Sequence, residues 1–359
     1  MFSIKIWNND RSSQLAKLKK FIRLEFDDVL DNFGTGLFKL DLLSDEADET
    51  ILKKFNRLSV FDGSTEKWRG YIYNWKINDD FTITIHLGSM LRFLNDKRFI
   101  TETYTDENVN TVFEDIINTM NSASPTEFTF GGSDITGPPS EDFEFQNTPM
   151  LDALKQVART VAGEIFIDLD DKIYLKGQVG EDKTSTVQFK FLQNKMNENN
   201  AKSFNVTDDG DDMVNYVLAK NNEDPPKTSV KSDATSITEF GRLEKPVVFP
   251  DITSQDALDS AAQDYLDKRK NPIVIPQIKP NEKKINESLY SIGDLCKIRI
   301  AYGFYGLDEN YRVVRKKYIV PKDADKAVIT LQVGNTSITR DDFFKRIASI
   351  EKRVNDLEK

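Results

Sequence analysis

Most of the first hundred residues alternate between apolar and polar side chains, and this period of two is the feature that most limits how the chain can fold. Alternating runs lie at residues 2–7, 22–27, 38–42, 71–77 and 81–87, with turns rich in Asn, Asp and Gly between them. Only residues 48–55 suggest a short helix. Because many short strands joined by such turns form barrels or sandwiches, residues 1–95 are predicted to form a first β-barrel.

The apolar period changes after residue 96. Apolar positions between Val109 and Met120 recur at spacings of three and four, which predicts one face of a helix. A second helix is expected to begin with Thr148 as N-cap and Pro149 at its first position, and to end at Gly163. Strands flanking Asp170 and Asp171 predict a hairpin directly after it, and residues 131–140 between the helices read as an irregular loop. Residues 96–185 are therefore predicted to be an inserted α/β domain.

Strand patterns return from residue 186 onward. They lie at residues 187–191, 213–219, 285–290, 295–300, 311–319 and 327–333. A helix capped by Thr253 or Ser254 interrupts them and ends in a basic run, so we place it at residues 253–270. The sequence thus predicts a second β-barrel over residues 186–340. The fold class expected for the whole chain is β-rich α+β.

The last segment, residues 341–359, has an apolar seam with steps of four and three. The seam consists of Phe343, Ile347, Ile350, Val354 and Leu357. Such spacing is typical of a coiled coil, and Ile at both seam positions favours three strands. The alternative is an amphipathic helix packed on its own domain.

Histidine and cysteine are almost absent, and this excludes several classes of chemistry. His86 is the only histidine and Cys296 the only cysteine, so zinc-protease sites with two His ligands, thiolate metal clusters and internal disulfides are ruled out. His86 is expected with Thr82 and Thr84 on the polar face of a strand, and Cys296 as a small buried residue. We predict no catalytic residue, no cofactor and no metal site.

Only carboxylate chemistry remains open. Glu141, Asp142 and Glu144 have the residue types of a glycosidase acid and base, but nothing in the sequence places them across a sugar. The acidic clusters at residues 168–171 and 208–212 fall where hairpin turns are expected, and turns favour Asp. A cell-wall hydrolase therefore stays as an alternative to a structural protein.

The charge balance is acidic, with 49 Lys and Arg against 59 Asp and Glu and a net charge of −10. Because phosphate affinity comes largely from Lys and Arg, tight DNA or RNA binding is not expected. An acidic surface past which DNA slides remains compatible with this charge. No signal peptide and no membrane-spanning apolar run are seen.

Several stretches resemble the hub proteins at the tip of phage tails. They read FDDVLDNFGTG at residues 26–36, WRGYI at 68–72, TPMLDAL at 148–154, DMVNYV at 212–217, SITEFGRLE at 236–244, IGDL at 292–295 and YRV at 311–313. Each stretch is short, but together they span nearly the whole chain in the right order.

The resemblance implies a homotrimer in which two barrels per chain form a ring of six. It implies a ring docked on the distal tail protein, contact with the tape-measure protein, DNA only in transit, and a fibre or tip protein at the C-terminus. The expected location is the tail tip of a virion assembled in the host cytoplasm. A carbohydrate-binding receptor protein of the same tail is a further alternative.

Overall fold

A computed structural model describes residues 1–359 except 123–127, 251, 253, 323 and 335–359. The chain divides into two compact units. The first consists of Met1–Ser203 and Ile278–Val333, and the second is built on Phe204–Gln277. None of the described helices is long and apolar enough to cross a membrane.

The first unit is dominated by one large sheet, and residues 1–89 supply what we call its N-terminal half-sheet. Its strands are β1 (Phe2–Trp7), β2 (Gln14–Leu18), β3 (Arg23–Val29), β4 (Thr35–Asp41), β5 (Arg57–Asp62), β6 (Thr65–Ile77) and β7 (Thr82–Ser89). They follow the order β3-β4-β7-β6-β5-β1-β2, and each strand is antiparallel to its neighbours in this order.

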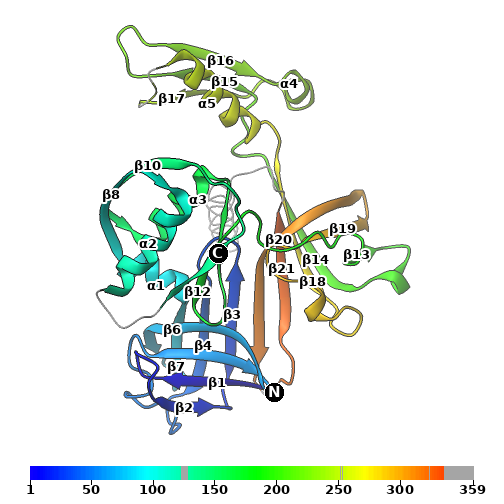
Figure 1. Ribbon diagram of the computed structural model, residues 1–359. Coiled ribbons are helices and arrows are strands. Elements are labelled where there is room, and N and C mark those ends of the chain that lie inside the picture. Colours follow the sequence, from blue (N-terminus) through cyan, green and yellow to red (C-terminus); the bar gives the residue numbers. More distant parts are fainter. Residues whose placement is uncertain (123–127, 251, 253, 323, 335–359) are drawn as a thin grey trace. The chain divides into compact units, whose positions relative to one another are not determined.

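Later residues supply the C-terminal half-sheet. Its strands are β13 (Gln188–Leu192), β14 (Ala201–Asp209), β18 (Ile273–Pro280), β19 (Leu295–Tyr302), β20 (Tyr305–Pro321) and β21 (Val328–Gly334). They follow the order β14-β18-β21-β20, with β19 on β20 and β13 on β19. The later part of β14 and the earlier part of β18 belong to the second unit. Pairing of β20 with β3 joins the two halves, and these strands lie side by side in Figure 1. The predicted β-rich class is confirmed, and the observed sheet is largely antiparallel.

Alternation along the strands explains which face is buried. In β7 the side chains of Ile83, Ile85 and Leu87 are buried, as the period of two predicts. The core continues across the joint between the halves, since Phe26 on β3 stacks on Tyr318 of β20 with ring centroids 4.5 Å apart. Trp68 is buried beside them and donates from its indole nitrogen to the Asp27 carbonyl at 3.0 Å.

The insert lies between the two half-sheets in the sequence. Its elements are α1 (Met90–Lys97), β8 (Phe99–Asn108), α2 (Val109–Ser122), β9 (Thr129–Ser133), β10 (Ser140–Pro149), α3 (Met150–Thr160), β11 (Glu164–Ile167) and β12 (Lys172–Lys176). The apolar face predicted for the first helix is confirmed, because Val109, Val112, Phe113, Ile116, Ile117 and Met120 are all buried. The hairpin around Asp170 is confirmed as well.

Some local predictions were wrong. Residues 48–55 form turns, stabilised in part by the Asp48 carboxylate, which accepts from the Thr50 and Ile51 amides. Residues 285–290 contain the short 3-10 helix η2 (Glu287–Leu289), which Asn286 caps. Thr148 lies within strand β10, which ends at Pro149; Pro149 is the N-cap of α3, and α3 ends at Thr160. The expected loop at 131–140 includes the end of β9 and the first residue of β10.

The second unit is a small α/β body that the sequence did not set apart. Its sheet has the order β16 (Thr228–Ser232), β15 (Tyr216–Lys220) and β17 (Glu244–Val248). Helix α5 (Gln255–Asp267) covers one face through Leu258, Ala262 and Leu266. The predicted N-cap Ser254 is confirmed, since its hydroxyl accepts from the Ala257 amide at 3.1 Å. The remaining helices are α4 (Ala234–Phe240) and, in the first unit, η1 (Met196–Glu198).

Candidate functional site: the joints between the half-sheets and the insert

The only site predicted from the sequence, the coiled-coil seam of Phe343, Ile347, Ile350, Val354 and Leu357, lies outside the described residues. The other residues considered in the sequence can be placed. His86 is half-buried on β7 with its ring 6.1 Å from that of Tyr73. Cys296 is fully buried on β19, and burial raises the pKa of its thiol to about 12. Such a thiol is an inert core residue, as expected.

The face predicted for His86 needs two corrections. Phe81 does not share the buried face of β7, because it lies in the preceding turn with a positive φ of 56° and is 70% exposed. Thr82 is buried at the beginning of the strand, where Asn78 donates to its hydroxyl oxygen at 3.0 Å.

The carboxylates considered for catalysis serve local structure. Glu141, Asp142 and Glu144 lie exposed on β10, where Asp142 accepts from the Asp106 amide and Glu144 from Gln146. Asp168 closes the β11–β12 turn by accepting from the amides of Asp170 and Lys172. No group of three or more His, Cys, Asp or Glu side chains in the described part of the chain is arranged to hold a metal ion.

The joint between the half-sheets pairs a basic strand with an acidic one. Arg315 of β20 donates to the Asp27 carboxylate of β3 at 2.8 Å. Lys317 and Arg23 both pair with Glu25. The Asp27 and Glu25 side chains are only 4% and 9% exposed, whereas their cationic partners are between 26% and 54% exposed. The carboxylates are therefore buried in the joint while the cations reach the solvent. Charge therefore favours β3 over other strands as the neighbour of β20.

A buried ion pair joins the insert to the C-terminal half-sheet. Arg312 of β20 grips Glu164 of β11 with two hydrogen bonds of 2.7 and 2.9 Å. The same guanidinium donates to the carbonyls of Val179 and Gly293. Both side chains are less than a tenth exposed, so the bidentate geometry and the extra acceptors offset the cost of removing two charges from water.

A close backbone contact supports this joint. Gly180, which follows the insert, packs against Gly293 so tightly that a Cβ on Gly180 would lie 2.2 Å from the Gly293 carbonyl carbon. Both glycines also have positive φ, at 84° and 85°. Only glycine satisfies both conditions without strain.

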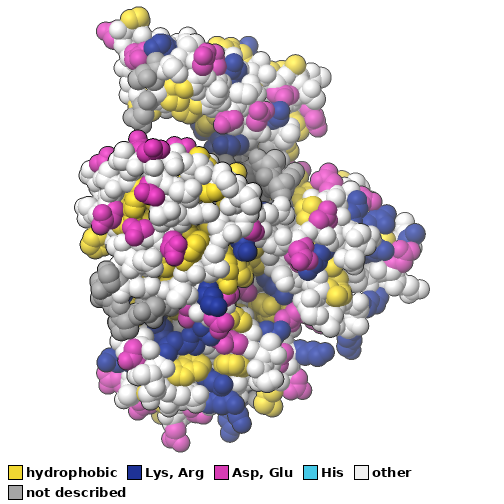
Figure 2. Space-filling model, viewed as in Figure 1, with side chains coloured by type: hydrophobic (Ala, Val, Ile, Leu, Met, Phe, Trp, Pro, Cys, Tyr) yellow, Lys and Arg dark blue, Asp and Glu magenta, His cyan; other side chains and the backbone are white. Residues whose placement is uncertain are grey.

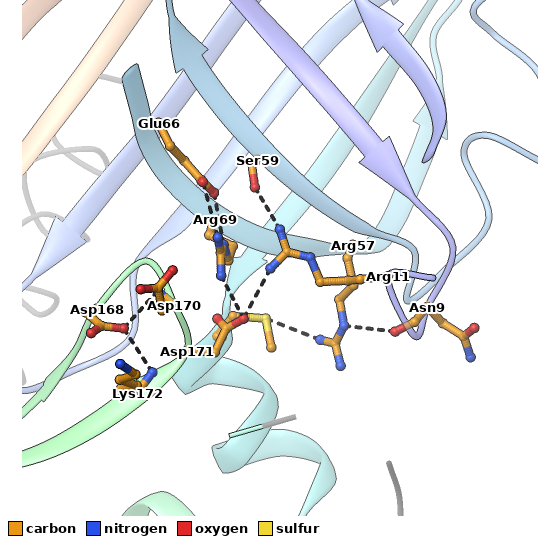
Figure 3. A network of polar contacts seen from close by, with 11 residues as sticks. Asn9, Arg11, Arg57, Ser59, Glu66, Arg69, Asp168, Asp170, Asp171 and Lys172 are labelled. Carbon is orange, nitrogen blue, oxygen red and sulfur yellow. Dashed lines mark hydrogen bonds and ion pairs between the residues drawn. The ribbon is translucent and has the colours of Figure 1, made fainter. Parts of the chain in front are cut away.

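A second polar network joins the insert to the N-terminal half-sheet (Figure 3). Asp171, at the tip of the β11–β12 hairpin, accepts from Arg11 at 3.2 Å and from Arg69 at 3.0 Å. Arg69 is also paired with Glu66 at 2.9 Å, and Arg11 donates to the Ser59 hydroxyl. Burial raises the pKa of the Asp171 carboxyl, against the opposing effect of the two arginines.

A cavity of about 600 Å³ lies beside these joints, between the β3–β20 joint and the β11–β12 hairpin. Its lining includes apolar Leu91, Phe166 and Ile292 and the charged pair Asp28 and Lys316, which are opposite each other in the strand register. Burial, followed by the charge of Asp27, raises the pKa of Asp28 to about 7. Burial lowers the pKa of Lys316, whose ammonium donates to the Tyr290 carbonyl at 3.3 Å. We assign this arrangement no reaction.

Sequence reasoning missed these joints. Glu164 and Arg312 are 148 residues apart in the sequence. The spacing of residues within a helix or strand does not predict a contact between side chains so far apart in the chain. One signal was available: Asp27-Asp28 and Arg315-Lys316-Lys317 are complementary charged runs inside strand patterns. Charges on a strand otherwise rich in buried residues indicate a partner of opposite sign.

A scan of protein-family models and a search of curated proteins found no match for this chain. Solved structures do match. The 43 kDa tail protein of prophage MuSo2 from Shewanella oneidensis superimposes with a TM-score of 0.67 at 12% identity, over 92% of this chain and 97% of that one. A tail protein from Neisseria meningitidis MC58 gives a TM-score of 0.66 at 12% identity, over 94% and 97%.

A third match extends the comparison. The Escherichia coli c3393 protein, a component of the type VI secretion system described as similar in structure to T4 bacteriophage tail proteins gp27 and gp5, gives a TM-score of 0.50 at 11% identity. The superposition covers 78% of the c3393 chain and 93% of this chain. The chain therefore has the fold of phage tail proteins and of proteins like the T4 baseplate hub. The resemblance stated from the sequence is confirmed at the level of the fold.

Proposed function

We propose that this chain is a structural subunit of a phage tail that works as a trimeric hub at the tail tip. The observation that carries the proposal is the mutual coverage: two tail proteins match it over more than nine-tenths of both chains. A match of this extent leaves no large part of either chain for a different architecture. Fold similarity alone does not fix function, so the hub role needs a test of its own.

Three features of the chain support a structural role. The large sheet is held by ion pairs and a shared aromatic core, and the insert is tied to both of its halves. The two half-sheets are the proposed barrels, and three chains would contribute six. The proposed partners are a distal tail ring, the tape-measure protein and a fibre or tip protein, with DNA passing through without being bound.

The surface charge agrees with weak DNA binding. The face seen in Figure 2 carries Lys and Arg side chains interspersed with Asp and Glu, with no continuous basic stripe on the described residues in view. Nucleic-acid binding needs clustered positive charge. An exiting polyanion would meet little attraction on such a surface.

The mass of the purified full chain in solution tests the proposal. Light scattering coupled to size exclusion should give three copies, and electron microscopy should show threefold averages. A monodisperse monomer at every concentration reached would contradict the hub role. A cell-wall zymogram separates the rival: a cleared zone that disappears in Glu144→Gln would show a carboxylate hydrolase instead.

The C-terminal seam gives a second test of the hub. We propose that Ile347 and Ile350 lie in a three-stranded coil on the trimer axis. Two heptads are too short to hold three chains alone, so the rest of the chain must assemble them. The double variant Ile347→Asp/Ile350→Asp should lose helical signal in circular dichroism and remain trimeric. A monomeric double variant would assign assembly to the coil.

A further inference from the structure

The cavity of about 600 Å³ beside the β3–β20 joint has the size of a small-molecule site. Ligand pockets in proteins commonly enclose about 300–1,000 Å³ and combine a mostly apolar lining with a few polar groups. Leu30, Leu91 and Ile165 belong to the apolar lining here, and Asp28 and Lys316 are charged groups of the same lining. Every lining residue belongs to the first compact unit. The cavity is therefore a feature of one folded body.

The carboxylate of Asp28 lacks a donor. Within the described part of the chain it accepts no hydrogen bond and is in no close ion pair, although Lys316 lies opposite it in the strand register. The Lys316 ammonium donates to the Tyr290 carbonyl instead. Burial without a donor disfavours the ionised carboxylate, and the pKa of Asp28 is accordingly raised. The protein thus supplies less positive charge at Asp28 than an ionised carboxylate needs.

The lining as a whole is acidic. Four of its side chains are carboxylates and two are ammonium groups. The carboxylates belong to Asp28, Asp31, Asp168 and Asp170, and the ammonium groups to Lys67 and Lys316. Lys67 is already paired with Glu287 at 2.6 Å. The balance of charge around the cavity therefore favours a cation as its ligand.

The β11–β12 hairpin adds an apolar wall and a second negative charge. Phe166 and Leu169 line the cavity, yet they are 37% and 39% exposed. Asp170 lines the cavity from the hairpin turn, where it lies exposed beside Asp168 (Figure 3). Apolar side chains left in water beside a cavity favour a ligand that covers them. The hairpin thus suits an aliphatic chain that ends in a positive group.

We propose that the cavity binds an aliphatic diamine, with one ammonium on the Asp28 carboxylate, the carbon chain against Phe166 and Leu169, and the other ammonium near Asp170. The first ammonium supplies the donors that Asp28 lacks, and a charge-assisted hydrogen bond is stronger away from bulk water. The chain removes the apolar surface of the hairpin from water. Bound in this way, the diamine links the β3–β20 joint to the insert. The site does not depend on the proposed trimer.

A metal ion and an anion are poorer candidates for this cavity. No group of three or more His, Cys, Asp or Glu side chains among the described residues could hold a metal ion. An anion would need the ammonium groups of Lys67 and Lys316. The first is paired with Glu287, and the second donates to the Tyr290 carbonyl at 3.3 Å and has a pKa that burial lowers. An anion would also meet the unpaired Asp28.

Titration calorimetry of the full chain with cadaverine tests the proposal. Pentylamine, pentanediol and glutarate are the matched ligands, because they have the same number of carbon atoms and differ in charge. Cadaverine should bind more tightly than pentylamine, and pentylamine about tenfold more tightly than pentanediol, since a buried hydrogen bond between charged groups is the stronger kind. Pentanediol or glutarate binding as tightly as cadaverine would overturn the proposal. The absence of cadaverine binding would overturn it as well.

Two variants with the same change of charge locate the ligand. Asp28→Asn keeps the shape of the side chain and removes its charge, so cadaverine should bind about tenfold more weakly. Asp79→Asn removes the same charge from an exposed turn outside the cavity lining and should bind cadaverine like the parent chain. If Asp28→Asn does not fold, Phe166→Ala on the exposed side of the hairpin replaces it and should also weaken cadaverine binding. Parent-like affinity in the folded variant would contradict the assigned position.

The pH dependence of binding gives a readout that the shape of the cavity does not provide. The pKa of Asp28 is about 7 in the free chain, and an ammonium binds only its ionised form. Because a diamine stays protonated near neutral pH, the affinity should fall about tenfold as the pH falls from about 8 to about 6. In Asp28→Asn the affinity should stay constant over this range, which separates the proton of Asp28 from that of Lys316. A parent chain whose affinity for cadaverine does not change with pH would refute the contact with Asp28.

Discussion

Two carboxylates, Glu164 and Asp171, join the insert to the sheet, and they differ in how far they are removed from water. The difference predicts how much stability each of the two joints contributes. Glu164 is gripped by Arg312 in a bidentate pair with side chains 3% and 9% exposed. Asp171 is shared by Arg11 and Arg69, whose side chains are 27% and 13% exposed. The first joint has removed both charges from water, so losing one partner is costly. The second is partly solvated, so water can replace much of what is lost.

The largest effect is expected at the buried joint. Arg312→Met leaves the Glu164 carboxylate buried without its partner, which should lower the free energy of unfolding by about 3–5 kcal/mol. Denaturant unfolding followed by fluorescence measures this. Arg299→Met is the control, because Arg299 on neighbouring β19 pairs with Asp308 in an exposed position and should cost less than about 1 kcal/mol. Equal losses in both variants would remove the distinction between the joints.

Asp28, which is opposite Lys316 in the strand register, extends the comparison to a carboxylate with a raised pKa. The pKa of Asp28 is raised to about 7 in the folded chain, above the ordinary value of 3.8, so the folded state holds this proton more tightly than the unfolded state. The stabilising effect is complete below pH 3.8 and is lost as the pH rises toward 7. Asp28→Asn should abolish this part of the pH dependence. Parallel stability curves for Asp28→Asn and the parent between pH 4 and pH 7 would contradict the assignment.

The sequence predicted the features set by neighbouring residues, but not the contacts between residues far apart in the chain. Local alternation identified β7 and the buried face of α2, because period and burial are set by near neighbours. It failed at residues 285–290, where Asn286 caps a 3-10 turn that competes with an alternating pattern. The joints were missed because their partners meet only after the sheet has formed.

The second unit shows the same limit on a larger scale. Residues 204–277 contain strand and helix patterns of ordinary strength, so the sequence assigned them to the second barrel. Their separation depends on which strands pair: β15 takes β16 and β17 as neighbours and none of the strands of the large sheet. Strand patterns predict that a strand exists, not which strand lies beside it.

The smallest effect is expected at the Asp171 joint. Asp171→Asn keeps an oxygen to accept from Arg69 and Arg11 but removes the negative charge between them, so we expect a loss of about 1 kcal/mol. Asp170→Asn, at an exposed position in the same turn, should change stability by less than about 0.5 kcal/mol. A double-mutant cycle of Asp171→Asn with Arg11→Gln measures the coupling directly. A coupling energy near zero would show that the shape of the hairpin, and not the ion pair, holds the insert in place at this joint. A loss of stability as large as that of Arg312→Met would show that partial exposure does not weaken the second joint.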